Sequence, residues 1–337
     1  MLKILAPHLQ SVVVNSTFAP TNTCIVSAPK TSGSNFSPHA LLCCVWGLVY
    51  NARMSNTIKH REFSLATFDQ QTLFAQEWTP SDAISSTKQP TIGLVHGLGE
   101  HSGRYSSVAS FFVKHGYRVI GYDHRGHGKT AGSMPSFEVL QNDIHSLCNY
   151  ATETSQGPLV LYGQSLGGAL VLKFLAENNT DKFAAAIVSS PLLTPTHAPP
   201  RLKVFFGELL LPWFPLVQLA HGLKPKDLTH DIAIVEQFRQ DPLVRRTVSI
   251  ALGYTMLESG RELLKSTHSY AIPMLLMHGS DDQITSAAST QHFAERHPNL
   301  TLKLWDGLYH ELHFERNATE ILEFVRLHIE RCLTTCA

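Results

Sequence analysis

The stretch from Leu159 to Ala176 constrains the fold more than any other part of the chain. A short apolar run ends in Gly163-Gln164-Ser165-Leu166-Gly167, and helix-favouring residues follow from Ala169. This order predicts a strand, a sharp turn and a helix, with Ser165 at the apex of the turn. The two glycines leave room for a strained serine, and the helix N-terminus aims backbone N–H groups at its hydroxyl. Gly-x-Ser-x-Gly also occurs in ordinary turns, so it is the strand and helix context that predicts a nucleophile elbow.

The rest of the chain alternates strands and helices. Two alternating segments between Glu62 and Trp78, separated by a polar turn, predict an antiparallel hairpin at a sheet edge. Continuous apolar runs then recur, as in parallel strands buried on both faces. The expected strands are Ile92–Val95, Arg118–Tyr122, Leu159–Tyr162, Ala184–Ser189, Ile272–His278 and Leu300–Trp305; the expected helices are Tyr105–Lys114, Phe137–Thr154, Ala169–Ala176, one from about Ser286, and Asn317–Leu333. The pattern predicts an α/β fold with a mostly parallel central sheet flanked by helices.

Composition excludes several classes of function. The 337 residues have a formal net charge of +0 and contain no run of lysine and arginine, so we expect no nucleic-acid partner. Of the six cysteines, three lie in the N-terminal segment, Cys332 and Cys336 lie at the extreme C-terminus, and Cys148 alone lies in the interior of the expected domain, which indicates a reducing compartment. The 19 histidines form no His-Glu-x-x-His motif and accompany no Cys-x-x-Cys motif, so we expect no metal site.

Residues 1–55 differ from the rest of the chain. They mix Ser, Thr, Asn and Pro with isolated apolar patches, and the longest patch, Ala40–Tyr50, is shorter than the roughly 20 residues of a membrane-spanning helix. The N-terminus also lacks a clear signal-peptide cleavage site. We expect this segment to be disordered or outside the functional domain, which we place at 56–333. Our hypothesis is that Met54 is the true start, after an unprocessed leader or a wrongly assigned reading frame.

The sequence also offers partners for Ser165. A serine hydroxyl is a poor nucleophile without a general base, and the base needs an orienting carboxylate. Asp281 and Asp282 follow one expected strand, and His310 follows the next, with His313 a turn further on. The order Ser, Asp, His fits residues that follow successive strands of one parallel sheet. Only one of two adjacent aspartates can reach the base, so we favour Asp282 with Asp281 as the alternative, and we favour His310 over His313.

A glycine-rich segment, His96-Gly97-Leu98-Gly99-Glu100, follows another strand. Free backbone N–H groups in such a loop can stabilise an oxyanion. In the predicted mechanism His310 takes a proton from Ser165, which attacks an ester carbonyl, and water hydrolyses the acyl-enzyme. The N–H groups of Leu98 and Leu166 bind the oxyanion, each commonly worth about 3 kcal/mol.

A second loop, Asp123-His124-Arg125-Gly126-His127-Gly128-Lys129-Thr130, does not have the spacing of a phosphate-binding loop. We expect Asp123 and Arg125 to fix its shape.

From Pro191 to about Tyr270 the alternation of strands and helices lapses. The segment Leu202–Leu223 is mostly apolar and carries four large aromatic side chains, Phe205, Phe206, Trp213 and Phe214. Exposed apolar surface of this size marks a binding surface. We therefore expect a cap over the active site at about 191–270 that forms an acyl-chain pocket, and peripheral contact of this cap with a membrane is a separate hypothesis. The alternative is a helical insertion that packs on the core.

Six motifs together resemble monoacylglycerol lipases of the α/β-hydrolase superfamily, over about residues 56–333. They are His96-Gly97-Leu98-Gly99-Glu100-His101-Ser102-Gly103-Arg104-Tyr105, Asp123-His124-Arg125-Gly126-His127-Gly128, Gly163-Gln164-Ser165-Leu166-Gly167-Gly168, Asp241-Pro242-Leu243-Val244, Gly279-Ser280-Asp281-Asp282 and Gly307-Leu308-Tyr309-His310. The first is the specific one, because α/β-hydrolases in general share only the elbow.

The resemblance implies an α/β-hydrolase fold with a helical cap, a triad of Ser165, Asp282 and His310, oxyanion donors at Leu98 and Leu166, and no cofactor. It implies a lipid ester as substrate, most simply a monoacylglycerol, in a cytoplasmic enzyme. The expected substrate-binding residues are Gly97, Glu100, Arg104 and Gln164; Glu100 and Arg104 either bind the polar head group or form an ion pair with each other.

Two departures from the family pattern matter. Gln164 stands where many members have histidine, and the cap sequence is the least similar portion. A lysophospholipase or a general carboxylesterase is the alternative activity, since the same triad serves any acyl ester. A non-catalytic lipid-binding protein is a further alternative, and the intact triad argues against it.

Overall fold

A computed structural model describes residues 11–13, 25–27, 57–81 and 88–335. The chain divides into two compact units, Met1–Leu48 and Val49–Ala337. In the first, strands β1 (Ser11–Val13) and β2 (Ile25–Ser27) pair antiparallel. The remainder of segment 1–55 lies outside the described residues, so the expectations about this segment and about Met54 stay predictions.

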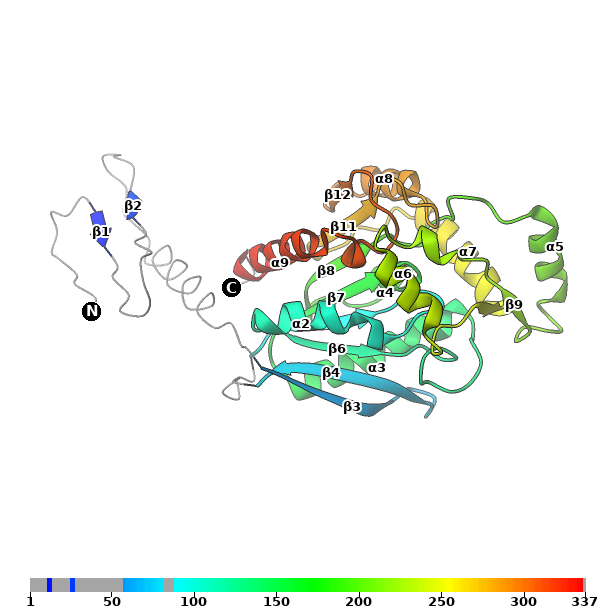
Figure 1. Ribbon diagram of the computed structural model, residues 1–337, viewed down its shortest axis with the longest axis horizontal. Coiled ribbons are helices and arrows are strands. Elements are labelled where there is room, and N and C mark those ends of the chain that lie inside the picture. Colours follow the sequence, from blue (N-terminus) through cyan, green and yellow to red (C-terminus); the bar gives the residue numbers. More distant parts are fainter. Residues whose placement is uncertain (1–10, 14–24, 28–56, 82–87, 336–337) are drawn as a thin grey trace. The chain divides into compact units, whose positions relative to one another are not determined.

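The described part of the second unit is built on one sheet of eight strands, in which the pairs β3–β4 and β4–β6 are antiparallel and the other pairs are parallel (Figure 1). The strands are β3 (Ile58–Ala66), β4 (Thr72–Pro80), β5 (Thr91–Val95), β6 (Arg118–Tyr122), β7 (Leu159–Gln164), β8 (Phe183–Ser189), β11 (Met274–Gly279) and β12 (Thr301–Trp305). Their order across the sheet is β12-β11-β8-β7-β5-β6-β4-β3. The predicted hairpin at a sheet edge is therefore confirmed as β3 and β4.

Helices cover both faces of this sheet. Helices α2 (Ser106–Lys114) and α9 (Ala318–Thr335) pack on one face, and α3 (Phe137–Thr154), α4 (Leu166–Glu177) and α8 (Ala287–Arg296) pack on the other. Consecutive residues of a central strand join opposite cores, as Val160 and Leu161 do. This double burial explains why the central strands read as unbroken apolar runs in the sequence.

The expected cap corresponds to the insertion between β8 and β11. It contains α5 (Arg201–Leu210), β9 (Gln218–Ala220), a short 3₁₀ turn (Pro225–Asp227), α6 (Ile232–Gln240), β10 (Thr247–Ser249) and α7 (Ile250–Lys265). The antiparallel pair of β9 and β10 was not expected. Helix α7 packs on α3, α4 and α8, whereas α5 packs on α7 and has no buried residue. The alternative, a helical insertion that packs on the core, therefore does not hold for α5. This helix stands apart from the sheet in Figure 1.

The loop after β6 has the structural role predicted for it. The Asp123 carboxylate accepts hydrogen bonds from the backbone and hydroxyl of Ser102, at 2.8 and 2.6 Å. Arg125 donates to Asp69 and to Asp143 at 2.6 to 2.8 Å. These bonds fix the loop between the turn that joins β3 to β4, η1 (Ser102–Tyr105) and α3.

Within the described residues no helix combines the length and the apolar character needed to cross a bilayer.

Candidate active site

Ser165 lies on a strained turn between β7 and α4. Its backbone has φ 56° and ψ −116°, a left-handed conformation that is costly for a side chain other than glycine. A Cβ on Gly163 would lie 2.5 Å from the Gly167 carbonyl oxygen, and one on Gly167 would lie 2.0 Å from the Val95 carbonyl oxygen. Both glycines of the motif are therefore required by close backbone approaches, and the geometry is that of a nucleophile elbow.

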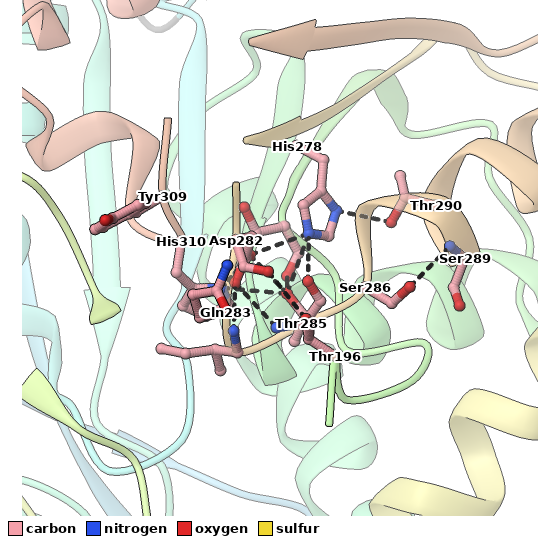
Figure 2. Close-up of polar contacts among 12 residues, drawn as sticks. Thr196, His278, Asp282, Gln283, Thr285, Ser286, Ser289, Thr290, Tyr309 and His310 are labelled. Atoms are coloured by element: carbon pink, nitrogen blue, oxygen red, sulfur yellow. Dashed lines mark hydrogen bonds and ion pairs between the residues drawn. The ribbon is translucent and has the colours of Figure 1, made fainter. Parts of the chain in front are cut away.

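Asp282 and His310 meet in direct contact. His310 Nδ1 donates a hydrogen bond of 2.7 Å to Asp282 Oδ2 (Figure 2). Asp281 is exposed and bonds to the neighbouring Ser280 hydroxyl instead. The ring of His313 is buried against Tyr105, with ring centroids 4.9 Å apart. Of the alternatives left open by the sequence, the structure thus joins Asp282 to His310.

One close backbone approach and one side-chain hydrogen bond bring the three segments of the site together. A Cβ on Gly279 would lie 2.3 Å from the carbonyl oxygens of Leu308 and Tyr309, so the end of β11 abuts the loop that carries His310. The Gln164 amide donates to the His310 carbonyl oxygen at 3.0 Å, which ties that loop to the elbow. In the described part of the chain the His310 ring forms hydrogen bonds through Nδ1 alone, so the link from Ser165 to Nε2 is not closed in this structure.

The ionisation of the Asp282–His310 pair follows from burial and mutual attraction. Burial alone would raise the pKa of Asp282, but the nearby His310 and His278 hold that pKa well below its ordinary value. Burial alone would lower the pKa of His310, but the Asp282 carboxylate raises it above its ordinary value. The pair is therefore suited to a base that gains a proton beside a carboxylate that stays charged.

The backbone around Ser165 provides candidate oxyanion donors. The N–H of Gly97 is already engaged, because it donates to Glu100 Oε1 at 2.6 Å. Leu98, the next residue, lines the cavity beside Ser165. Leu166 is the first residue of α4, where a backbone N–H has no acceptor within the helix.

Glu100 and Arg104 are buried in an ion network that includes Glu311. Arg104 donates to Glu100 Oε2 at 2.8 Å and to both carboxylate oxygens of Glu311 at 2.6 and 2.8 Å. Tyr105 donates its hydroxyl to Glu100 as well. Glu100, Arg104, Gly97 and Gln164 are not among the residues that line the cavity. The geometry favours the ion-pair alternative, and a head-group role for Glu100 and Arg104 stays a prediction.

A cavity of about 550 Å³ connects Ser165 with the cap. Its lining is mainly apolar and includes Leu98, Leu192, Val204 of α5, Leu219 of β9, and Met256 and Leu257 of α7. Pockets of this size and character hold small apolar ligands.

Sequence reasoning missed two side chains that contact Asp282. The His278 ring nitrogen Nε2 lies 3.0 Å from Asp282 Oδ2, and the Thr285 hydroxyl lies 2.9 Å from the same oxygen. The sequence pattern indicates His278 only as the last residue of an expected strand. The sequence signal that could have identified His278 is its position four residues before Asp282, near the end of the strand.

Comparison with known proteins agrees with this geometry. Residues 86–317, more than half of the chain, match the family model described as serine aminopeptidase, S33. The chain belongs to this family. Within the serine aminopeptidase S33 family, the resemblance to monoacylglycerol lipases predicted from the sequence is confirmed by two kinds of relative.

Curated relatives include monoglyceride lipases. The chain is 30% identical to that of Rattus norvegicus over 259 residues, which is 74% of this chain and 84% of the relative, and 30% identical to that of Homo sapiens over 261 residues, with the same coverage. It is also 35% identical over 277 residues to an abhydrolase domain-containing protein of Dictyostelium discoideum, of which it spans only 29%.

Solved structures include two lipases of similar fold. The monoacylglycerol lipase of Paleococcus ferrophilus is 27% identical with a TM-score of 0.68, over 77% of this chain and 98% of that one. A monoglyceride lipase variant from Saccharomyces cerevisiae, 20% identical with a TM-score of 0.71 over 84% of this chain and 98% of that one, shares the fold. The predicted α/β-hydrolase fold is confirmed.

Proposed function

We propose that this protein is a serine hydrolase that cleaves a monoacylglycerol into a fatty acid and glycerol through an acyl-enzyme. The observation that carries the proposal is the mainly apolar cavity that runs from Ser165 into the cap. The 30% identity to monoglyceride lipases supports the same substrate class.

In the proposed reaction Ser165 is the nucleophile. His310 accepts its proton on Nε2, because Nδ1 is committed to Asp282, and Asp282 orients the ring and stabilises its charged form. The N–H groups of Leu98 and Leu166 bind the oxyanion. His310 then returns the proton to the leaving glycerol oxygen, and water attacks the acyl-enzyme with His310 as base.

An ester substrate suits the site better than the free amino terminus of a peptide. Binding an ammonium group would call for a carboxylate without another partner. Glu100 and Glu311, the buried carboxylates beside the elbow and the His310 loop, are both paired with Arg104. Asp227 lines the cavity, but so do Lys203 and Lys224, and the lining is mainly apolar. These features favour a neutral lipid ester although the family description names an aminopeptidase.

The cap supports a further proposal, contact with a lipid surface. Trp213 is 79% exposed, and Phe205, Phe206 and Phe214 are each about half exposed. Helix α5 also supplies Lys203, Val204 and Gly207 to the cavity lining, so the exposed apolar side chains lie beside the cavity. A lipid surface at this position would deliver its monoacylglycerol directly to the pocket.

A substrate comparison tests the proposed function. Wild-type protein is given a long-chain monoacylglycerol, a lysophospholipid with the same acyl chain and a short-chain ester, and kcat/KM is measured for each. We expect the highest kcat/KM for the monoacylglycerol. A preference for the short-chain ester would keep the serine chemistry but contradict the acyl pocket, and a preference for the lysophospholipid would contradict the glycerol head group.

A further inference from the structure

Asp282 lies between two histidines, and only one of them belongs to the proposed triad. Its Oδ2 is 2.7 Å from His310 Nδ1 on one side and 3.0 Å from His278 Nε2 on the other (Figure 2). The His278 side chain comes from β11 and is completely buried, as is that of Asp282. The partners of this histidine matter, because burying an imidazole costs free energy unless its nitrogens are hydrogen-bonded.

The neighbours of His278 fix where its proton lies. Nε2 lies 3.0 Å from both the Asp282 carboxylate and the Thr285 carbonyl oxygen, which can only accept, whereas the Thr285 hydroxyl is farther away, at 3.3 Å. Nε2 therefore carries the hydrogen. Nδ1 lies 2.8 Å from the Thr290 hydroxyl of α8, which holds the ring in one orientation.

The remaining contacts of Asp282 complete a ring of donors. Its Oδ1 accepts from the backbone N–H groups of Ile284 and Thr285 at 2.7 and 3.0 Å. The Thr285 hydroxyl, at 2.9 Å from Oδ2, also lies 3.1 Å from the Ser190 carbonyl oxygen, a second acceptor for its single hydrogen. The single His278 Nε2–H hydrogen-bonds to the Thr285 carbonyl oxygen and also lies 3.0 Å from Oδ2, on the side opposite His310.

We propose that His278 is a positioning residue of the hydrolase reaction, which acts through Asp282. Its N–H, shared between Asp282 Oδ2 and the Thr285 carbonyl oxygen, holds the carboxylate in the rotamer that orients His310, and it offsets part of the negative charge of Oδ2 so that His310 is not made too basic. This inference rests on the proposed function, since it needs His310 to act as the base. The other titratable groups that interact with His310 are the carboxylates of Glu311 and Glu100 and the imidazole of His313, and none of the substitutions below alters any of them.

Three variants test the role of His278. His278→Phe fills the site without a donor, His278→Gln keeps an N–H donor near the position of Nε2, and Thr290→Val removes only the partner of Nδ1. Each is assayed for kcat and KM, for the pH dependence of kcat/KM, and for the rate at which a fluorophosphonate labels Ser165. Melting temperature reports folding separately.

We expect His278→Phe to lower kcat and the labelling rate by roughly 10- to 100-fold with KM unchanged. The acid limb of its pH profile should move to higher pH, because Asp282 without this donor stabilises charged His310 more strongly. His278→Gln should restore most of kcat, and Thr290→Val should lower kcat by a smaller factor. If His278→Phe does not fold, the other two variants decide.

The inference is overturned if folded His278→Phe, or Thr290→Val in its place, labels and turns over at the wild-type rate. It is also overturned if folded His278→Gln is as slow as His278→Phe, since packing alone would then explain the loss. Absence of Ser165 labelling in wild-type protein would instead contradict the proposed function, so the two failures are distinguishable.

Discussion

Glu311 binds Arg104 through both of its carboxylate oxygens, at 2.6 and 2.8 Å, in the position directly after His310. Arg104 in turn binds Glu100, which accepts a hydrogen bond from Gly97 beside the elbow. One buried guanidinium therefore connects the loop of the proposed oxyanion donor to the loop of the proposed base.

Arg104→Met should destabilise the fold by about 3–5 kcal/mol, because it leaves Glu100 and Glu311 buried without a cation. Denaturant unfolding measures this change. The matched control is Lys129→Gln, which breaks the exposed ion pair with Glu62 and should cost less than about 1 kcal/mol. A higher KM with unchanged stability in Arg104→Met would instead support a head-group role for this residue.

The pH dependence of the reaction should follow His310. Only the neutral ring can accept a proton, and Asp282 raises its pKa above the ordinary value, so kcat/KM should fall as the pH drops through that raised pKa. Asp282→Asn should lower kcat by about 10⁴-fold and move the acid limb to lower pH, since the carboxylate no longer stabilises the charged ring. An acid limb that does not move in Asp282→Asn would show that another group titrates.

Gly279→Ala should separate Asp282 from His310. The new methyl group would lie 2.3 Å from two carbonyl oxygens of the His310 loop, and a displacement of about 1 Å can cost about 10²-fold in rate. We expect this loss in kcat. Gly207→Ala is the control for kcat alone, since a Cβ there meets nothing within 4 Å but Gly207 lines the cavity and can affect KM. Equal kcat in the two variants would contradict the role assigned to the Gly279 approach.

Vesicle co-sedimentation tests contact of the cap with lipid. Trp213→Ala with Phe214→Ala removes two exposed aromatic rings, and the double variant should partition less into the pellet than wild type. Leu327→Ser removes an exposed apolar side chain from α9 and should partition like wild type. Equal recovery of wild type and the double variant in the supernatant would end the proposal.

The sequence predicts best what is encoded locally. The bounds of β6 and α3 agree with the apolar patterns that predicted them, because a strand buried on both faces is a short unbroken apolar run and an amphipathic helix has a period of about 3.6 residues. The triad candidates were found for the same reason, since each follows an expected strand. Strands β9 and β10 were missed because they have three residues each, and all three residues of β9 are exposed.

Contacts between distant residues were beyond sequence reasoning. Arg104 and Glu311 are 207 positions apart, and their pairing depends on how η1 and the loop after β12 meet across the sheet edge. His278 and Asp282 are only four positions apart in the sequence, but their contact depends on the turn after β11. The sequence predicted that the loops carrying the triad candidates meet. The structure was needed to show which side chains around them pair with one another.

Fatty-acid release from a monoacylglycerol should be compared between wild-type protein and Ser165→Ala, with melting temperatures to show that both are folded. We expect wild-type protein to release fatty acid and Ser165→Ala to lose about 10⁴-fold or more of this rate. Release by folded Ser165→Ala at a rate near that of wild type would contradict the assignment of Ser165 as the nucleophile.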